Sequence, residues 1–230
     1  MQNFIIIGNT RTGTHRIAEF LYKNLKYKIK TEKRNKNIYS GLLREDLFKK
    51  EKNKFYIFKP ELDKKFTSIE IKKLLKKKIL ITHKIYRNIF FDFKDYKYIL
   101  SIRDPISVIN STIMYVTKKN IMKFNNQYKI KNPLKLVQNK KIIDKYIRAY
   151  YNFYKSVYNK VNGSNLKKLI IVDYEENLNK KFKSFEFKDR LRTVSKFHST
   201  KKNKKVEKFL NENYNFSDCF KIYNYFLKKI

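Results

Sequence analysis

Five short apolar runs, rich in β-branched and aromatic residues, divide the chain and predict buried strands. They cover residues 4–7, 55–58, 79–83, 98–102 and 169–172. Other segments repeat apolar residues three and four positions apart, which predicts amphipathic helices. These segments begin at Thr14 and at residues 69, 104, 142, 206 and 216. Strands that alternate with helices predict an α/β fold, a three-layer sandwich with a mainly parallel central sheet and helices on both faces.

Two longer segments have opposite patterns. Residues 142–161 carry a tyrosine stripe, Tyr146, Tyr150, Tyr154 and Tyr158, which is typical of a helix face packed in a core. Residues 118–139 show no sustained period and predict an irregular, mobile segment over a substrate site.

The first strand runs into a loop bounded by Gly8 and Gly13, and helical spacing begins directly after it. A strand, a glycine-bounded loop and a helix direct backbone N–H groups and a helix N-terminus at an anion. Arg11 and the hydroxyls of Thr12 and Thr14 add donors suited to phosphate-like oxygens. This unit therefore predicts an anion site, the alternative being a tight turn with a chance arginine.

The same loop is close to a Walker A loop, which favours a P-loop NTPase-like fold. Gly8 and Gly13 have the Walker A spacing, but Thr14 and His15 follow where an NTPase needs Lys and then Ser or Thr. The cation lies inside the loop instead, at Arg11. The pattern predicts a phosphate-containing ligand that is bound without a metal.

Length and composition favour one domain over residues 1–230, because no repeat or domain-scale linker interrupts a chain that is 42% hydrophobic. No window of about 18 apolar residues predicts a membrane span. The first strand begins at Phe4, so no signal peptide is expected. Cys219 is the only cysteine, which excludes an intrachain disulfide and a cysteine-cluster metal site. A reducing, cytoplasmic setting is expected.

The net charge is +36, from 56 Lys and Arg against 20 Asp and Glu. Such a charge fits a polyanionic partner, for example nucleic acid, an acidic glycan or a membrane surface. Lys, Asn, Ile, Tyr and Phe are all abundant, however, and A/T-rich codons alone would produce that bias. We attribute most of the charge to composition and expect no specific nucleic-acid partner, while local basic residues steer an anionic cofactor.

Several candidate residues lie at or just past the ends of predicted strands. They are Arg11, His83, Arg103 and Tyr174. In parallel sheets, ligands bind at the carboxyl ends of the strands, so these residues are expected to converge on one crevice.

Two of these segments together resemble the sulfotransferase family that uses 3′-phosphoadenosine 5′-phosphosulfate (PAPS). Residues 8–14, GNTRTGT, are similar to the family's 5′-phosphosulfate loop, in which Lys or Arg precedes Ser/Thr-Gly-Thr. Arg103, with Ser111 eight residues beyond it, resembles the family's 3′-phosphate site. The pairing of these two motifs is the specific part of the resemblance.

Two weaker matches follow the same order. Thr82-His83 resembles the segment that carries the catalytic histidine of cytosolic members, and residues 172–178 resemble the stretch whose tyrosine, here Tyr174, approaches the adenine. The order of elements covers residues 4–210. The resemblance implies an enzyme that moves a sulfuryl group from PAPS to a hydroxyl or amine acceptor, leaving adenosine 3′,5′-bisphosphate (PAP).

The resemblance implies the following site. Arg11 stabilises charge on the bridging oxygen, and His83 is the base that takes the acceptor proton. The cofactor is held by Arg11, Thr12, Gly13, Thr14, His15, Arg103, Ser111 and Tyr174. Glu61 is the rival base, because glycan-modifying members use a glutamate from an earlier strand–helix junction.

Some positions depart from the family. His15 stands where Thr or Ser is usual, and Arg16 stands where many members place a Trp beneath the adenine, so a guanidinium plane would stack there instead. The Arg-Lys-Gly segment near the C-terminus is absent, and residues 195–202 are its candidate substitute. His198 within them is expected to be a loop residue.

The acceptor is left open between a glycan and a small molecule, because acceptor pockets are built from variable loops, here 39–48 and 118–139. A P-loop kinase or nucleotidase that lost its lysine, and a basic nucleic-acid-binding protein, are the alternative functions.

Overall fold

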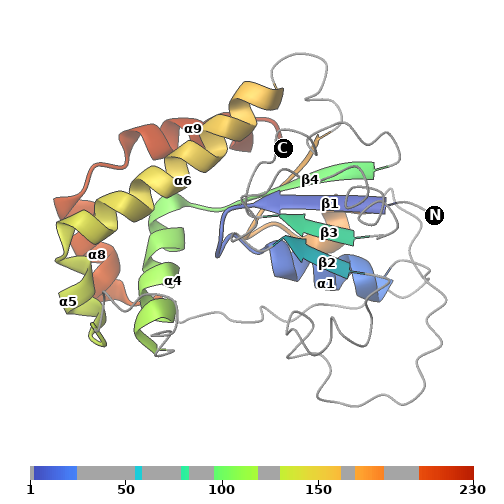
Figure 1. Cartoon of the computed structure of the whole chain (residues 1–230). Coiled ribbons are helices and arrows are strands. Elements are labelled where there is room, and N and C mark those ends of the chain that lie inside the picture. Colours follow the sequence, from blue (N-terminus) through green and yellow to red (C-terminus); the bar gives the residue numbers. More distant parts are fainter. Residues whose placement is uncertain are drawn as a thin grey trace, which may run out of the picture.

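Five strands form the centre of the computed structural model: β1 (Asn3–Gly8), β2 (Phe55–Phe58), β3 (Ile79–Thr82), β4 (Tyr96–Ile102) and β5 (Leu169–Asp173). They make one sheet in the order β2-β3-β1-β4-β5, and all four neighbouring pairs are parallel (Figure 1). The structure describes residues 3–24, 55–58, 79–82, 96–118, 130–161, 169–183 and 202–230. All five predicted strands and the parallel sheet are confirmed.

The described part of the chain contains the helices α1 (Thr14–Asn24), α4 (Pro105–Lys118), α5 (Pro133–Val137), α6 (Lys140–Val161), α7 (Leu178–Lys181), α8 (Lys204–Asn213) and α9 (Ser217–Leu227). In the described part of the chain, none of them combines the length and the apolar character that a membrane crossing requires. The helix expected at 69–77 lies outside the described residues.

The prediction that residues 118–139 form an irregular segment is wrong for part of that range. Residues 133–137, within the segment expected to be irregular and mobile, form helix α5. The Asn132 side chain caps it by accepting a hydrogen bond from the Leu134 N–H at 2.9 Å, and Pro133 suits the first helical position. Leu136 and Val137 are buried. A helix this short has no visible period in the sequence and is held by its cap and by core contacts.

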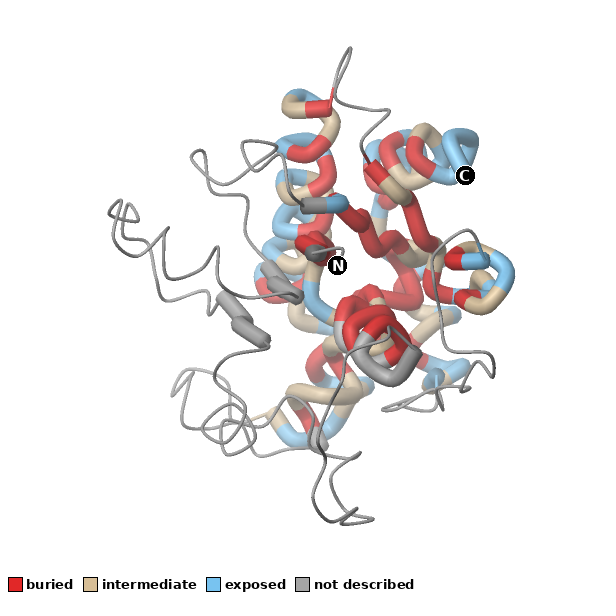
Figure 2. Tube along the Cα trace, turned by 90° about the vertical axis from the view of Figure 1, so that its right-hand side faces the viewer, coloured by how far each residue is buried: buried red, intermediate tan, exposed pale blue. Residues whose placement is uncertain are grey.

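Side chains of β1 alternate between two packed faces of the sheet. Ile5 and Ile7 belong to a buried cluster that also includes residues of α4, α5, α6, α8 and α9. Phe4 and Ile6 are equally buried but lie outside that cluster, as the period-2 geometry of a strand requires. Figure 1 shows α1 on the side of the sheet away from α6 and α9, and Figure 2 shows the buried positions where sheet and helices meet. The complete three-layer sandwich stays a prediction, because the chain between β1 and β4 is described only in part.

The strand order decides which loops meet. β1 pairs with β4 on one side and β3 on the other, and its last residue, Gly8, lies opposite Ser101 near the end of β4. The chain leaves β1 toward β2 and β3 and returns across the sheet to β4. In open α/β sheets, ligands bind at such a reversal of strand order. The loops that follow Gly8 and Ile102 are therefore neighbours at the carboxyl edge.

The predicted tyrosine stripe of α6 lies in the core as expected. Tyr150 and Tyr154 are each only 1% exposed, whereas Tyr146 and Tyr158 are half-buried against the same cluster. The Tyr150 and Tyr154 rings are 4.8 Å apart, and Tyr154 also contacts Phe153 and, from α9, Phe226.

This burial predicts a loss of stability at alkaline pH. Burial raises the pKa of both Tyr150 and Tyr154 above the ordinary value of 10. Above pH 10 the unfolded chain releases these protons while the folded chain keeps them, so the free energy of unfolding falls as pH rises. The slope is about 1.4 kcal/mol per pH unit for each tyrosine. Urea unfolding between pH 8 and 11 measures it, and Tyr154→Phe is expected to remove one tyrosine's share. An unchanged slope in that variant would contradict the assignment.

Candidate functional site

The loop after β1 has an unusual backbone that its own side chains hold. Arg11 has φ 69° and Gly13 has φ 95°. A positive φ costs a residue with a Cβ roughly 1–2 kcal/mol, and such residues concentrate at functional sites. The Thr12 hydroxyl, fully buried, donates to the Asn9 carbonyl at 2.7 Å, and the Thr10 N–H donates to the Asn9 side chain at 2.7 Å. The Thr12 hydroxyl, expected to be a ligand donor, is thus engaged within the loop.

Neither glycine of the loop leaves room for a side chain. A Cβ on Gly13 would lie 2.7 Å from Cδ2 of Tyr174, and a Cβ on Gly8 would lie 2.6 Å from Cγ2 of Thr14. Thr14, the first residue of α1, is itself 2% exposed. The loop therefore packs directly on the Tyr174 ring from the tip of β5.

Arg103, just past the end of β4, reaches back to this loop. Its Nη1 donates to the Arg11 carbonyl at 3.1 Å, and its guanidinium carbon lies 3.9 Å from the centre of the Tyr174 ring. Its Nε is fully buried and has no hydrogen-bond partner among the residues that the structure describes. Arg103 forms no ion pair with any carboxylate in the described part of the chain. An unpaired buried donor on a cation is costly, so the geometry fits an anionic acceptor there.

The Arg11 side chain is held against α4. Its Nε donates to the Ser111 hydroxyl at 3.0 Å, and its guanidinium carbon lies 4.7 Å from the centre of the Tyr115 ring. Burial lowers the pKa of Arg11, and the nearby charge of Arg103 adds to the lowering while Tyr115 opposes it. Two guanidinium groups that repel each other at one edge are a favourable setting for a bound anion.

Tyr115 was not anticipated from the sequence. Ser111 and Tyr115 are four residues apart on α4, so they lie on the same helix face and together direct Arg11. The one available signal was the four-residue spacing of Ser111 and Tyr115. That spacing points to a shared contact with Arg11 only once Arg11 is known to face α4.

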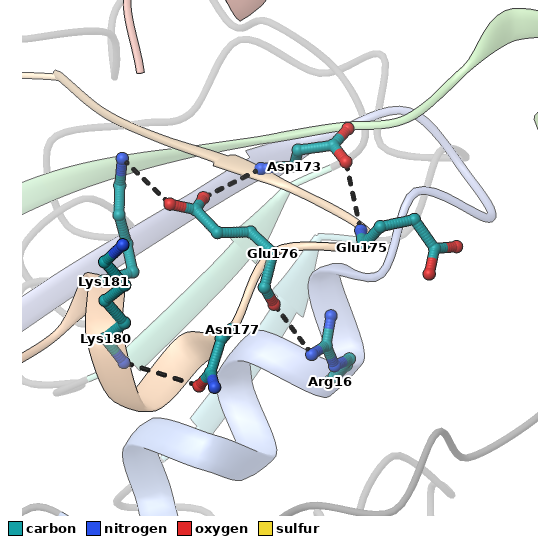
Figure 3. Close-up of polar contacts among 7 residues, drawn as sticks. All are labelled: Arg16, Asp173, Glu175, Glu176, Asn177, Lys180 and Lys181. Carbon is teal, nitrogen blue, oxygen red and sulfur yellow. Dashed lines mark hydrogen bonds and ion pairs between the residues drawn. The ribbon is translucent and has the colours of Figure 1, made fainter.

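Arg16 of α1 holds the turn that follows β5 (Figure 3). Its Nη1 donates to the Tyr174 carbonyl and its Nη2 donates to the Glu176 carbonyl at 3.0 Å. The Glu176 carboxylate in turn accepts from the Asp173 N–H at 3.3 Å and pairs with Lys181 at 3.4 Å. Both terminal nitrogens of Arg16 thus bind backbone carbonyls and tether the tip of β5, while stacking of the Arg16 plane on a base stays a prediction.

The structure brings together seven of the expected site residues at one edge of the sheet. They are Arg11, Thr12, Gly13, Thr14, Arg103, Ser111 and Tyr174. Tyr174 is 9% exposed, with its ring packed on Gly13 and Arg103. His83, Glu61 and His198 lie outside the described residues, as does the His15 side chain. The structure therefore bears on the anion-binding half of the expected site, and the position of the base stays a prediction.

A cavity of about 350 Å³ opens beside Arg103. Its lining comes from the tips of β4 and β5 and from α4, α8 and α9, and includes Asp104, Asp173, Glu207 and Tyr223. The Tyr223 hydroxyl donates to Asp173 at 3.0 Å, and burial raises the pKa of Tyr223. Cavities of this volume suit small molecules. Across the described ranges, no group of three or more His, Cys, Asp or Glu could hold a metal ion.

No protein-family model matches the chain, and no curated protein sequence matches it. The chain is similar in structure to the mouse sulfotransferase SULT7A1, which was solved in complex with PAP. The TM-score is 0.45 and the sequence identity is 16%, over 98% of this chain and 64% of that one.

Proposed function

We propose that the protein is a sulfotransferase that moves a sulfuryl group from PAPS to a hydroxyl or amine acceptor. The observation that carries the proposal is the meeting of Arg11 and Arg103 at neighbouring strand tips. The Arg103 Nε is buried there and has no partner in the described ranges of the chain. A ligand with two anionic groups, one at the 5′ and one at the 3′ position of a nucleotide, suits two separate guanidinium groups better than a single phosphate does.

Each residue has a proposed task. Arg11 and the N–H groups of the loop bind the 5′ end of the nucleotide, and Arg103 binds its 3′-phosphate. Ser111 assists, since a hydroxyl can accept from Arg11 and donate to a phosphate at the same time. Tyr174 approaches the adenine, as the resemblance implies, and its ring face supports Arg103. The loop residues Thr12, Gly13, Thr14 and His15 shape the 5′ side.

When bound, PAPS supplies an activated sulfuryl group whose transfer leaves negative charge on the phosphate oxygen. Arg11 is placed to stabilise that charge, in the manner of other preorganised cation sites. The acceptor must lose a proton as its new bond to sulfur forms, and we assign that proton to His83, whose ordinary pKa of about 6.5 suits a base, with Glu61 as the rival. No residue of this scheme requires a metal. The acceptor, a glycan or a small molecule, is not specified by these residues.

Nucleotide binding gives the direct test. PAP at 100 times its Kd is expected to stabilise the protein by about 2.7 kcal/mol, which raises Tm by roughly 5–10 °C for a chain of this size. AMP lacks the 3′-phosphate and is expected to give a much smaller shift. Differential scanning fluorimetry with and without EDTA measures both shifts, and EDTA is expected to change neither.

Two outcomes would contradict the proposal. Equal shifts with PAP and AMP would exclude a 3′-phosphate site. A shift that appears only with ATP and magnesium would instead favour the P-loop kinase alternative. If PAP binds, turnover of labelled PAPS over a panel of acceptors identifies the acceptor.

A further inference from the structure

Two carbonyls near the end of β4 receive hydrogen bonds from tyrosine hydroxyls of α6. The Tyr150 hydroxyl donates to the Arg103 carbonyl at 2.8 Å, and the Tyr154 hydroxyl donates to the Ser101 carbonyl at 2.8 Å. β1 ends at Gly8, opposite Ser101, so the β1–β4 ladder does not extend to Arg103. The Arg103 carbonyl, beyond the end of that ladder, needs another donor.

The same network continues into the arginine loop. The Ser101 hydroxyl donates to the Thr12 carbonyl at 2.6 Å, and Arg103 Nη1 donates to the Arg11 carbonyl at 3.1 Å. One helix face, carrying Tyr150 and Tyr154 four residues apart, thereby reaches both Arg103 and the loop that bears Arg11. These contacts lie in the core, where Tyr150, Tyr154 and Ser101 are each 1% exposed.

We infer that Tyr150 and Tyr154 are positioning residues, whose hydroxyls set where Arg103 and the Arg11 loop stand relative to each other. Phenylalanine would fill the same volume but would supply no donor, so the packing of the stripe alone does not call for tyrosine. Burial also raises the pKa of both hydroxyls, which keeps them protonated donors at neutral pH. The expected effect of these tyrosines on PAP binding rests on the proposed function. Their effect on the position of Arg103 and of the Arg11 loop does not.

Tyr214 provides a matched control. Its hydroxyl donates to the Val137 carbonyl at 2.6 Å and joins the end of α8 to α5, away from the arginine loop. Tyr214→Phe therefore removes a bond of the same kind between a tyrosine and a backbone carbonyl. It is expected to leave nucleotide binding unchanged.

The experiment compares Tyr150→Phe, Tyr154→Phe and Tyr214→Phe by calorimetric titration with PAP and with AMP. A lost buried hydrogen bond corresponds to about a 5- to 20-fold rise in the Kd for PAP in each of the first two variants. The rise should be smaller for AMP, so the preference for PAP over AMP falls. A purely structural role would lower Tm and leave this preference intact. Tyr154→Phe acts through Ser101, so its Kd values still test the inference if Tyr150→Phe does not fold.

A second readout does not depend on PAP. The Arg103 Nε–H signal in a ¹⁵N NMR spectrum is expected to shift in Tyr150→Phe and to stay in place in Tyr214→Phe. If the wild type fails to bind PAP but this signal shifts, the positioning role stands and the proposed function does not. If the wild type binds PAP and all three variants match it in both readouts, the inference is overturned.

Discussion

Arg103→Ala is expected to raise the Kd for PAP by about 10- to 150-fold, the equivalent of one charge-assisted hydrogen-bonding group. The Kd for AMP, which lacks the 3′-phosphate, is expected to change by less than about 3-fold. The physical reason is the buried Nε of Arg103, which has no hydrogen-bond partner among the described residues and which an anionic acceptor would satisfy. Calorimetric titration of both nucleotides measures the two effects.

The control must remove the same charge elsewhere, because the net charge of +36 attracts any nucleotide. Arg148 on α6 serves, since it is exposed and its Nε donates within its own helix, to the Asp144 carbonyl. Arg148→Ala is expected to leave both Kd values near those of the wild type. Arg103→Lys keeps the charge but loses the guanidinium fork, so it should recover only part of the affinity. Equal losses in Arg103→Ala and Arg148→Ala would mean that general electrostatic attraction, and not a site, binds the nucleotide.

Gly13→Ala is expected to lower the free energy of unfolding by roughly 2–5 kcal/mol. This loss of stability has two separate causes. The φ of 95° is costly for any residue with a Cβ, and the added carbon would lie 2.7 Å from the Tyr174 ring. Displacing that ring also removes the surface on which Arg103 lies, at 3.9 Å, so PAP binding should weaken in the same variant. Urea unfolding and titration measure the two losses.

A double-mutant cycle separates the causes. In a Tyr174→Ala background the clash is absent, and Gly13→Ala is expected to cost only the share due to the backbone, about 1–2 kcal/mol. If Gly13→Ala lowers the free energy of unfolding equally in both backgrounds, the clash with Tyr174 contributes nothing to the loss of stability.

The strands were predictable because each is a short run of mainly apolar residues, a pattern typical of strands in a parallel sheet. The start of α4 was equally clear: Asp104 accepts from the Ser107 N–H at 2.7 Å, as a capping aspartate before a proline should. Helix α5 was missed because its five residues carry no period. The difference is one of length, since a local pattern needs several turns to show itself.

Within the site, the residue types were readable and their pairings were not. Ser111 was expected beside a phosphate together with Arg103, and in the structure its hydroxyl accepts a hydrogen bond from Arg11. Arg16 was expected under a base, and its terminal nitrogens bind the carbonyls of the turn after β5. Long arginine side chains can reach several partners, so spacing in the sequence does not choose among them.

The amino-acid sequence by itself determined the strands, the parallel sheet they imply and the arginines at the strand tips, because hydrophobic period and turn chemistry are local. Only the tertiary structure decided that Arg103 meets the Arg11 loop, that Tyr174 lies between Gly13 and Arg103, and that two helix tyrosines hold the end of β4. These contacts join residues that are 47 to 161 positions apart in the chain. They depend on strand order and helix docking, which no local pattern encodes.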